Sequence, residues 1–274
     1  MFYCSQPPSP PLSPFVRMFW LYEWGPHPQE YSRWLPSGTA QIVIDLSGDG
    51  LPIPELSTTG SPQTLARALF NGADTRYFFE ENHHPMYRIG VDFKPGGAYP
   101  FFGPPASQLR DVHLPLETLW GIRALDQMRE RLMRARAPQE RFAVLEEELL
   151  GQLAHPLEHH PAVTLALRAF SKVPRGPAIA RLAEQTAFSH RQFVSIFREE
   201  VGLAPKEFAR VQRFSRVVQR TRKRQAIDWS RLAIECGYYD QAHLIKEFHA
   251  FAGLVPSEYL RDHAEQSEQS EQSA

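Results

Sequence analysis

The chain has 274 residues, of which 42% are hydrophobic and 22% charged, and its formal net charge at pH 7 is -1. These values are typical of a globular protein long enough for two domains, and no apolar run approaches the roughly 18 residues that a membrane span requires. No basic segment followed by an apolar one opens the chain, so no secretory signal is expected. The two cysteines, Cys4 and Cys236, are too few for a disulfide framework or a cysteine-based metal cluster, and we expect a reducing, cytoplasmic location.

Short β-type runs occupy the N-terminal part of the chain, after a Pro-rich stretch at residues 1–14 that we expect to be extended. They are bounded by Pro and Gly and lie at Phe15–Tyr22, Gln41–Leu46, Tyr77–Phe79 and Tyr87–Phe93. Strands of this length and spacing predict an antiparallel sandwich or barrel. We therefore place a β-rich sensor or dimerisation domain at residues 1–120.

The periodicity changes to that of helices in residues 121–170. Helices are expected over Ile122–Arg136, Gln139–Ala154 and Ala162–Phe170, because apolar residues recur there at three- and four-residue spacing. This helical linker could pack on its own β domain or on a second subunit, so a homodimer is an open alternative. Pro174-Arg175-Gly176-Pro177 then breaks the helix and forms a natural hinge.

The C-terminal segment contains one helix-turn-helix pattern written twice, about fifty residues apart. The first copy runs from Leu182 through Phe197 to Pro205, and the second from Leu232 through Phe248 to Pro256. Two aligned copies are stronger than a single match, and short helices joined by a tight turn commonly place one helix in a DNA major groove. We predict an all-α DNA-binding domain with two reading helices at residues 171–264.

Local signals fix where the two reading helices begin. Ser189 and Gln192 have the spacing of a capping box, Asp228 and Asp240 are expected N-caps in the second copy, and Gly237 supplies its tight turn. With the apolar faces turned to the core, the remaining candidates for DNA contact are Ser189, His190, Arg191, Val194, Ser195 and Arg198 in the first helix, and Gln241, Ala242, His243, Ile245, Lys246 and His249 in the second.

The charge distribution agrees with a DNA-binding C-terminal segment. Residues 171–262 carry 16 Lys and Arg against 10 Asp and Glu, whereas residues 1–170 carry 14 against 18. Basic helix surfaces are common, and an exposed cation is as often solvated surface as a DNA contact. The basic run Arg222-Lys223-Arg224 favours phosphate contact over a merely hydrated loop. A helix from Pro205 to about Arg222 must separate the two heads by close to one duplex turn, roughly 34 Å, if both enter adjacent grooves.

The C-terminal segment resembles the AraC/XylS family of transcription regulators. The resemblance lies in Gly237-Tyr238-x-Asp240 followed by Phe248, Gly253, Pro256 and Tyr259. It implies a two-lobed helical domain on double-stranded promoter DNA, and RNA polymerase as a partner. By position, it implies base contacts from Arg191, Val194 and Ser195 and from Gln241, Ala242 and Lys246. At the apolar Val194 and Ala242, the alternatives are a contact with a thymine methyl group or no base contact.

The N-terminal half resembles an uncharacterised cupin-like domain fused to some members of that family. The resemblance lies in Trp34-Leu35-Pro36-Ser37-Gly38 and in the run from Phe93 to Phe102. It implies a domain that senses a small-molecule effector or mediates dimerisation. The candidate ligand-binding residues are Trp20, Arg33, Trp34 and Tyr99, for which core packing is an equally good explanation.

A metal-dependent cupin-type enzyme and a protein-interaction module are the alternatives. His83-His84 and the group His155, His159 and His160 have ligand-like spacing, but Pro156 and Pro161 break the helix that the second group would need. No Gly-rich phosphate loop, serine elbow or paired-carboxylate pattern is present, so we expect no enzyme activity, cofactor or metal. The basic excess of the C-terminal segment argues against an interaction module. Glu-Gln-Ser repeats predict a disordered tail at residues 265–274.

Overall fold

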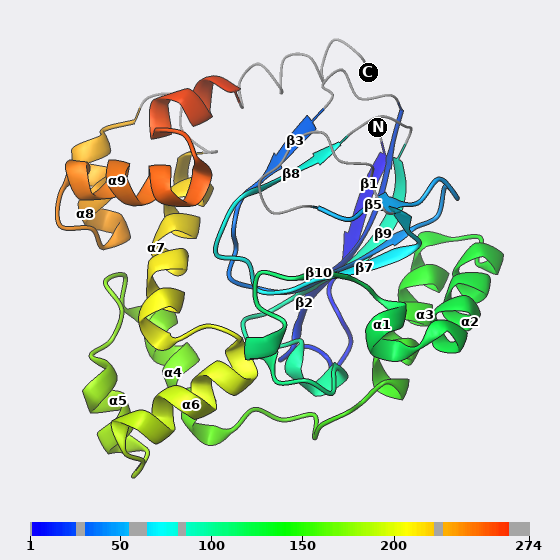
Figure 1. Ribbon diagram of the computed structural model, residues 1–274, viewed down its shortest axis with the longest axis horizontal. Coiled ribbons are helices and arrows are strands. Elements are labelled where there is room, and N and C mark those ends of the chain that lie inside the picture. The colour runs from blue at the N-terminus through cyan, green and yellow to red at the C-terminus, as the bar shows by residue number, and fades with distance from the viewer. Residues whose placement is uncertain (1, 26–30, 55–64, 82–85, 222–226, 263–274) are drawn as a thin grey trace.

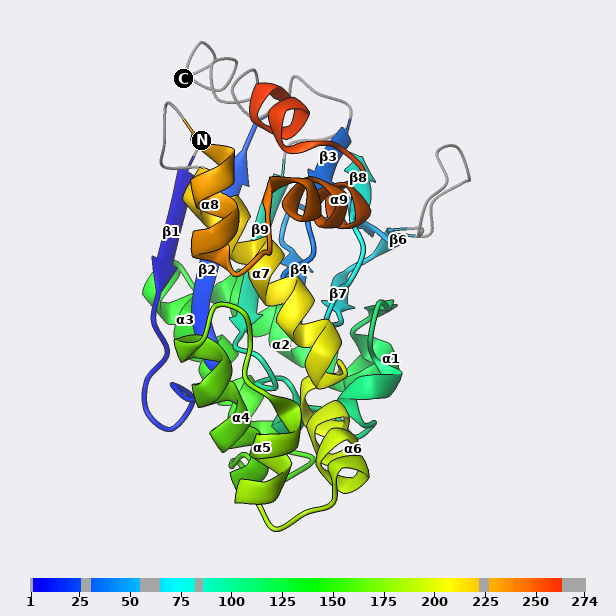
Figure 2. The ribbon, with the colours of Figure 1, turned by 90° about the vertical axis from the view of Figure 1, so that its left-hand side faces the viewer.

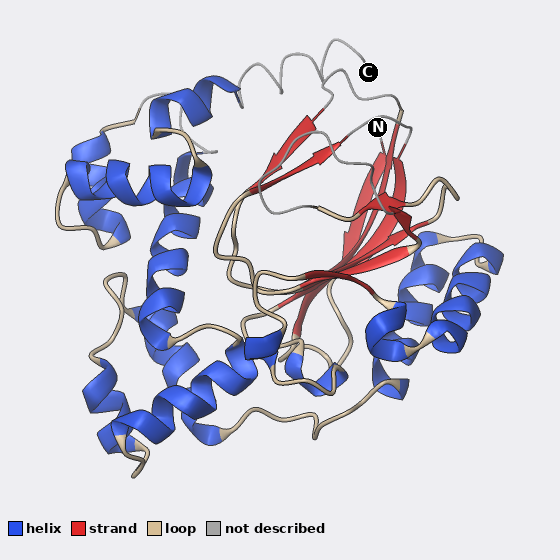
Figure 3. Ribbon diagram, in the orientation of Figure 1, coloured by secondary structure: helices blue, strands red, loops and turns tan. Residues whose placement is uncertain are grey.

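The computed structural model describes residues 2–25, 31–54, 65–81, 86–221 and 227–262. The basic run at residues 222–224, the pair His83-His84 and the C-terminal tail lie outside these ranges. Strands form the N-terminal half and helices the C-terminal half, which confirms the predicted α+β class (Figures 1 and 3). None of the helices in the described ranges is long and apolar enough to cross a membrane.

An antiparallel six-stranded sheet organises the N-terminal half, in the order β1-β2-β9-β4-β7-β10. Its strands are β1 (Phe2–Gln6), β2 (Val16–Trp24), β4 (Gln41–Asp45), β7 (Ala68–Asn71), β9 (Met86–Phe93) and β10 (His113–Pro115). Two antiparallel ribbons pair β3 (Tyr31–Trp34) with β8 (Phe78–Glu81) and β5 (Leu51–Pro52) with β6 (Leu65–Ala66). The four predicted strands are present within about two residues as β2, β4, β8 and β9. Strand β1 was expected only to be extended, but it pairs with β2 along its whole length.

The two faces of the six-stranded sheet differ, because successive side chains of a strand point to opposite sides. One face is apolar and buried, and it packs on helices that cover one side of the sheet (Figure 1). These helices are α1 (Glu117–Trp120), α2 (Ile122–Arg134) and α3 (Pro138–Gly151). Phe19 of β2 stacks on Phe142 of α3 with ring centroids 6.3 Å apart. The first two predicted linker helices therefore pack on their own β domain.

The C-terminal half is a bundle around a second core. Its helices are α4 (Pro161–Lys172), α5 (Ile179–Gln185), α6 (His190–Val201), α7 (Pro205–Thr221), α8 (Trp229–Cys236) and α9 (Gln241–Ala252), and residues 256–262 are also helical. The second core begins with α4, earlier than the expected boundary at residue 171. The reason is the aromatic contact of Phe170, whose ring lies 5.8 Å from that of Phe197 and 5.1 Å from that of Phe208.

Short 3-10 helices join the two halves of the molecule. They are η1 (Tyr99–Phe101) and η2 (Ala106–Gln108), and η2 contacts α6. A Cβ added to Gly202, just after α6, would lie 3.1 Å from the carbonyl oxygen of Ala106. The first helix-turn-helix copy thus sits directly against the N-terminal half.

Candidate DNA-binding surface and ligand cavity

The two reading helices, α6 and α9, lie at opposite ends of α7 (Figures 1 and 2). Helix α7 has 17 residues, so it rises by about 25 Å at 1.5 Å per residue. Both reading helices turn their C-terminal ends toward the N-terminal half, where Glu199 and Ala252 form hydrogen bonds with it. Their N-terminal ends therefore point away from the body of the molecule.

The start of each helix is set by the predicted capping residues. Ser189 Oγ accepts a hydrogen bond from Gln192 N at 3.3 Å, and Gln192 Oε1 accepts from Ser189 N at 3.0 Å, which completes the capping box. Asp240 accepts from His243 N at 2.7 Å, and Asp228 accepts from Arg231 N at 3.0 Å. Gly237 has φ +91°, a backbone conformation that favours glycine. The predicted turns and caps are confirmed.

None of the residues expected to meet DNA is buried. Val194 and Ile245 are half-buried because they pack against the helical core, Gln241 accepts a hydrogen bond from Ser230, and His243 meets the ring of Tyr238 edge-on. The remaining candidates are exposed, namely Ser189, His190, Arg191, Ser195, Arg198, Ala242, Lys246 and His249.

One exposed aromatic side chain beside the second reading helix was missed. Tyr239 is 80% exposed in the turn before α9. Sequence analysis singled out the neighbouring Tyr238, which is buried, and did not consider Tyr239.

The C-terminal end of α6 is held by a buried carboxylate. Glu200 is 7% exposed and accepts hydrogen bonds from His159 Nδ1 at 3.0 Å and from the backbone nitrogen of His160 at 2.9 Å. The Tyr99 hydroxyl donates to Glu199 at 3.4 Å. Burial, aided by the charge of Glu199, raises the pKa of Tyr99. Tyr99 therefore serves the contact between the halves, not a cavity with the candidate tryptophans.

The C-terminal end of α9 is held by a single cation. Arg33 Nη1 donates to the carbonyl oxygen of Ala252 at 2.6 Å, where a positive charge interacts favourably with the helix dipole. Its guanidinium lies over the rings of Tyr77 and Phe79, at 5.0 and 4.6 Å from their centroids. Arg33, a candidate ligand residue, shares a cleft beside α7 with Trp34, its neighbour on the strand, but does not line the cavity that contains Trp20 and Trp34.

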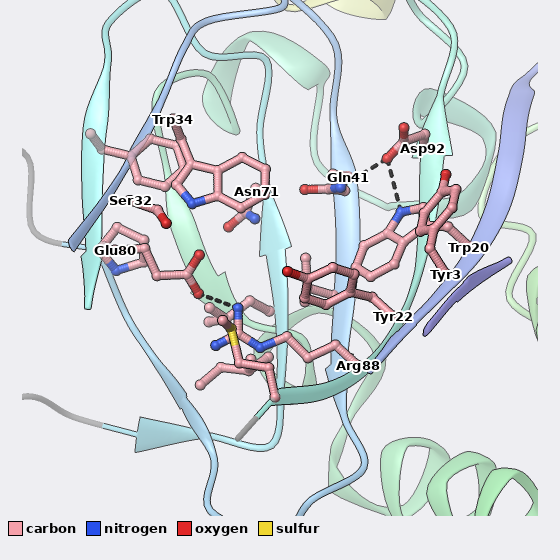
Figure 4. Close-up of a pocket in the computed structure, with 16 residues that line it drawn as sticks. Tyr3, Trp20, Tyr22, Ser32, Trp34, Gln41, Asn71, Glu80, Arg88 and Asp92 are labelled. Atoms are coloured by element: carbon pink, nitrogen blue, oxygen red, sulfur yellow. Dashed lines mark hydrogen bonds and ion pairs between the residues drawn. The ribbon is translucent and has the colours of Figure 1, made fainter. Parts of the chain in front are cut away.

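A cavity of about 330 Å³ lies between the six-stranded sheet and the β3–β8 ribbon (Figure 4). Two predicted residues, Trp20 and Trp34, line it from opposite sides, with Tyr22 beside Trp20. Phe78 also lines it and stacks on Trp34. The other lining residues are Tyr3, Ser32, Gln41, Val43, Leu51, Pro54, Leu69, Asn71, Glu80, Met86, Arg88 and Asp92.

Gly90 makes room for the Trp20 indole that lines this cavity. A Cβ at position 90 would lie 2.2 Å from Cζ2 of Trp20 and 2.5 Å from the carbonyl oxygen of Ile42. Because such distances are far below van der Waals contact, no larger residue fits while the indole and the strand pairing stay in place.

The polar groups of the cavity come from alternate positions of its strands. Arg88 forms an ion pair with Glu80 at 2.5 Å, and Asp92 Oδ1 accepts from Trp20 Nε1 at 3.1 Å and from Gln41 Nε2 at 2.8 Å. Burial, together with Glu80, raises the pKa of Tyr22 to about 12, so its hydroxyl stays protonated at neutral pH. Sequence analysis did not identify these polar cavity residues. The only signal that could have indicated them is the alternation of side chains between the two faces of a strand.

A buried acid-base pair lies behind the cavity. Asn71 Oδ1 accepts from His113 Nδ1 at 2.9 Å, while His113 Nε2 lies 3.7 Å from Asp74 Oδ1 and has no hydrogen-bond partner among the described residues. Burial raises the pKa of Asp74 to about 8, with a further contribution from Asp111, and burial lowers the pKa of His113 to about 4. Both side chains are therefore mainly uncharged at neutral pH.

The histidines with ligand-like spacing serve other contacts. His155 stacks on Tyr99 with ring centroids 4.2 Å apart, and His159 binds Glu200. Within the described ranges, no group of three or more His, Cys, Asp or Glu side chains is arranged to hold a metal ion.

Comparison with known proteins divides the chain into two matched segments. Residues 5–115 match a family described as a domain of unknown function (DUF6597), and residues 182–262 match one described as a helix-turn-helix domain. A curated relative, an uncharacterized HTH-type transcriptional regulator of Haemophilus influenzae, is 32% identical over 84 residues. The matched segment is 30% of this chain and spans only 28% of that relative.

Two solved structures are similar to this chain over different lengths. ToxT from Vibrio cholerae has a TM-score of 0.43 and 12% identity, over 94% of this chain and 97% of that one. The DNA-binding domain of AdpA, a global transcriptional factor solved in complex with a target DNA, has a TM-score of 0.36 and 23% identity, over 40% of this chain and 97% of that one.

Proposed function

We propose that this chain, whose residues 182–262 are a helix-turn-helix domain of the AraC type, is a sequence-specific DNA-binding regulator of transcription. The observation that carries the proposal is the pair of capped reading helices at the two ends of α7, with exposed polar side chains at their outward ends. The basic excess of the same segment supports attraction to phosphates.

Within this proposal, each reading helix contacts both the bases and the phosphates of the DNA. Arg191 and Lys246 are exposed and donate to guanine or to phosphate, Ser195 and Gln241 bind base edges, and Val194 or Ala242 meets a thymine methyl group. Ser189, His190, Arg198, His243, Ile245 and His249 form the rim of the same surface. Ile245 and Val194 contribute least, because half of each side chain already packs on the core.

We also propose that the cavity holds a small-molecule effector and that the β3–β8 ribbon relays its presence. Ser32, Trp34 and Glu80 line the cavity, whereas Arg33 and Phe79, from alternate positions of the same two strands, form the contact that holds α9. A ligand that shifts the ribbon would therefore move the support of the second reading helix. In this scheme residues 1–120 sense the effector, residues 121–170 connect, and residues 171–264 bind DNA.

The remaining parts of the proposal concern partners. A homodimer and a contact with RNA polymerase are proposed from the family resemblance, and sedimentation of the full chain tests the first. We assign the N-terminal half a sensing role and no catalytic one.

A salt titration with the full chain tests the DNA-binding proposal. Binding to random duplex DNA should weaken with a steep log-log dependence on salt, because Lys and Arg displace counterions from phosphates. Absence of binding at low salt, or a slope near zero, would contradict it.

Replacing one reading-helix cation tests the assignment of base contacts. On a site selected from a random library, Lys246→Ala should weaken binding by about 1–3 kcal/mol, while Lys172→Ala, at the end of α4, is the matched control. An equal loss on random DNA would assign Lys246 to a phosphate.

A further inference from the structure

The ionised side chains that line the cavity do not balance in charge. They are Glu80, Arg88 and Asp92, and the first two neutralise each other at 2.5 Å. Asp92 accepts hydrogen bonds only from the uncharged donors of Trp20 and Gln41 and has no ion-pair partner among the described residues. In the adjoining cleft, Arg17 donates instead to Thr39 at 3.3 Å. One negative charge therefore remains at the cavity wall, where it attracts a positive ligand.

The walls of the cavity are aromatic on two opposite sides. Trp20 and Tyr22 form one side, and Trp34 and Phe78 form the other, with the last two rings nearly parallel at 11° and 6.3 Å between centroids. The faces of such rings carry partial negative charge, so they attract cations and stack on flat ring systems. The space between the two sides suits a flat ring with a positive substituent.

The hydrogen-bonding groups that face the cavity include oriented acceptors. Because Gln41 Nε2 donates to Asp92, the Oε1 atom of Gln41 is turned toward the cavity (Figure 4). The Tyr22 hydroxyl also points into this space. A ligand with N–H donors is matched by these oxygens, whereas the guanidinium that an anion would need is already bound by Glu80.

We infer that the cavity binds a small organic cation, namely a flat aromatic ring carrying a protonated amine, with Asp92 as its counter-charge. The inference rests on the proposed function only in taking the cavity as the effector site. An anionic or uncharged ligand of the same shape is the competing possibility.

Three indole derivatives that share one ring and differ in charge separate these possibilities. Tryptamine is a cation, tryptophol is uncharged and indole-3-acetate is an anion at neutral pH. Titration calorimetry with the full chain should give an affinity for tryptamine at least about tenfold higher than for tryptophol, which corresponds to 1.4 kcal/mol, and weaker binding still for indole-3-acetate. Equal or tighter binding of either competitor, or no binding of tryptamine at millimolar concentration, overturns the inference.

Two variants test whether Asp92 and Trp34 cause the preference for tryptamine. Asp92→Asn keeps an oxygen acceptor for Trp20 and Gln41 and should remove most of the advantage of tryptamine over tryptophol. Glu23→Gln, which changes an exposed carboxylate on the neighbouring strand β2, should not. An unchanged preference in a folded Asp92→Asn protein contradicts the role of Asp92. If that variant does not fold, Trp34→Leu is the second test, because Trp34 is 42% exposed and its replacement should disturb the core little. Trp34→Leu should weaken tryptamine binding several-fold, and an undiminished affinity contradicts the aromatic site.

The same preparations separate this inference from the proposed function. A chain that binds duplex DNA but not tryptamine loses only the ligand class. A chain that binds tryptamine but no DNA keeps the cation site and loses its role as a regulator.

Discussion

The two copies of the helix-turn-helix are attached to the N-terminal half in different ways. The first is held by the hydrogen bond from Tyr99 to Glu199 and by close backbone packing of Gly202 on Ala106. The buried Glu200 ties it to the linker at His159 and His160, and an ion pair between Arg110 and Glu207 at 2.6 Å holds the start of α7 just after it. The described contacts at the end of α9 are those of Arg33 and Tyr77 with Ala252 and Gly253. Two segments with one sequence pattern are thus attached by contacts of unequal extent, and we call the first the fixed copy and the second the adjustable copy.

The largest expected effect on the free energy of unfolding is that of a substitution in the fixed copy. Glu200→Ala should lower the free energy of unfolding by about 2–3 kcal/mol, because it leaves the His160 backbone nitrogen and the His159 ring without their buried acceptor. Urea unfolding measures the loss. Glu199→Ala is the matched control, since it loses only the 3.4 Å bond from Tyr99. Similar losses in both variants would remove the distinction drawn for the first copy.

A smaller, pH-dependent effect is expected from Asp74, which lines the cleft beside α7. Its folded pKa is raised to about 8 from 3.8, so the stability it contributes is complete below pH 3.8 and is lost as pH rises toward 8. His113 has a folded pKa lowered from 6.5 to about 4, so its contribution is complete above pH 6.5 and is lost as pH falls toward 4. Between about pH 4 and 6.5 the two contributions change the free energy of unfolding with pH in opposite directions and cancel. From about pH 6.5 to 8 only the contribution of Asp74 changes with pH.

The free energy of unfolding should therefore fall by about 1–2 kcal/mol across that upper window. Urea unfolding at several pH values measures the fall, and Asp74→Asn should flatten it. A fall that persists in Asp74→Asn would have another origin.

The smallest effect is expected at the adjustable copy. Arg33→Ala should destabilise the last turn of α9 by about 1 kcal/mol or less, because it removes one cation from a helix C-terminus. Amide hydrogen exchange should become faster in α9 and stay unchanged in α6. Arg67→Ala, which breaks an exposed ion pair with Asp126, is the control. Faster exchange in both reading helices would mean that the copies move together.

Features that depend on residues close together in the chain were predictable from the sequence. The caps at Ser189 and Asp240, the turn at Gly237 and the strands of the β domain follow from local chemistry, and the structure agrees with each. The repeat also predicted the two reading helices, because equivalent core positions recur in both copies.

Features that depend on distant contacts were not predictable. The polar lining of the cavity is assembled from separate strands, and α4 joins the second core through rings on α6 and α7. Arg33 and Trp34 were grouped as ligand residues, yet adjacent residues of a strand face opposite sides. The sequence of β3 shows no clear alternation of polar and apolar residues, so only the pairing of β3 with β8 shows which face each of the two side chains occupies.

Because Gly90 has no side chain, a single added methyl group should separate the proposed sensing role of the N-terminal half from the proposed DNA-binding role of the C-terminal half. In a Gly90→Ala chain, either the indole of Trp20 or the pairing with Ile42 must give way, and the recess that accepts a ligand is obstructed. The DNA-reading half is built on a separate core and should keep its shape. Under the proposed function, such a chain would no longer respond to its effector, and transcription from its target promoters would show whether the ligand-free protein activates or represses them.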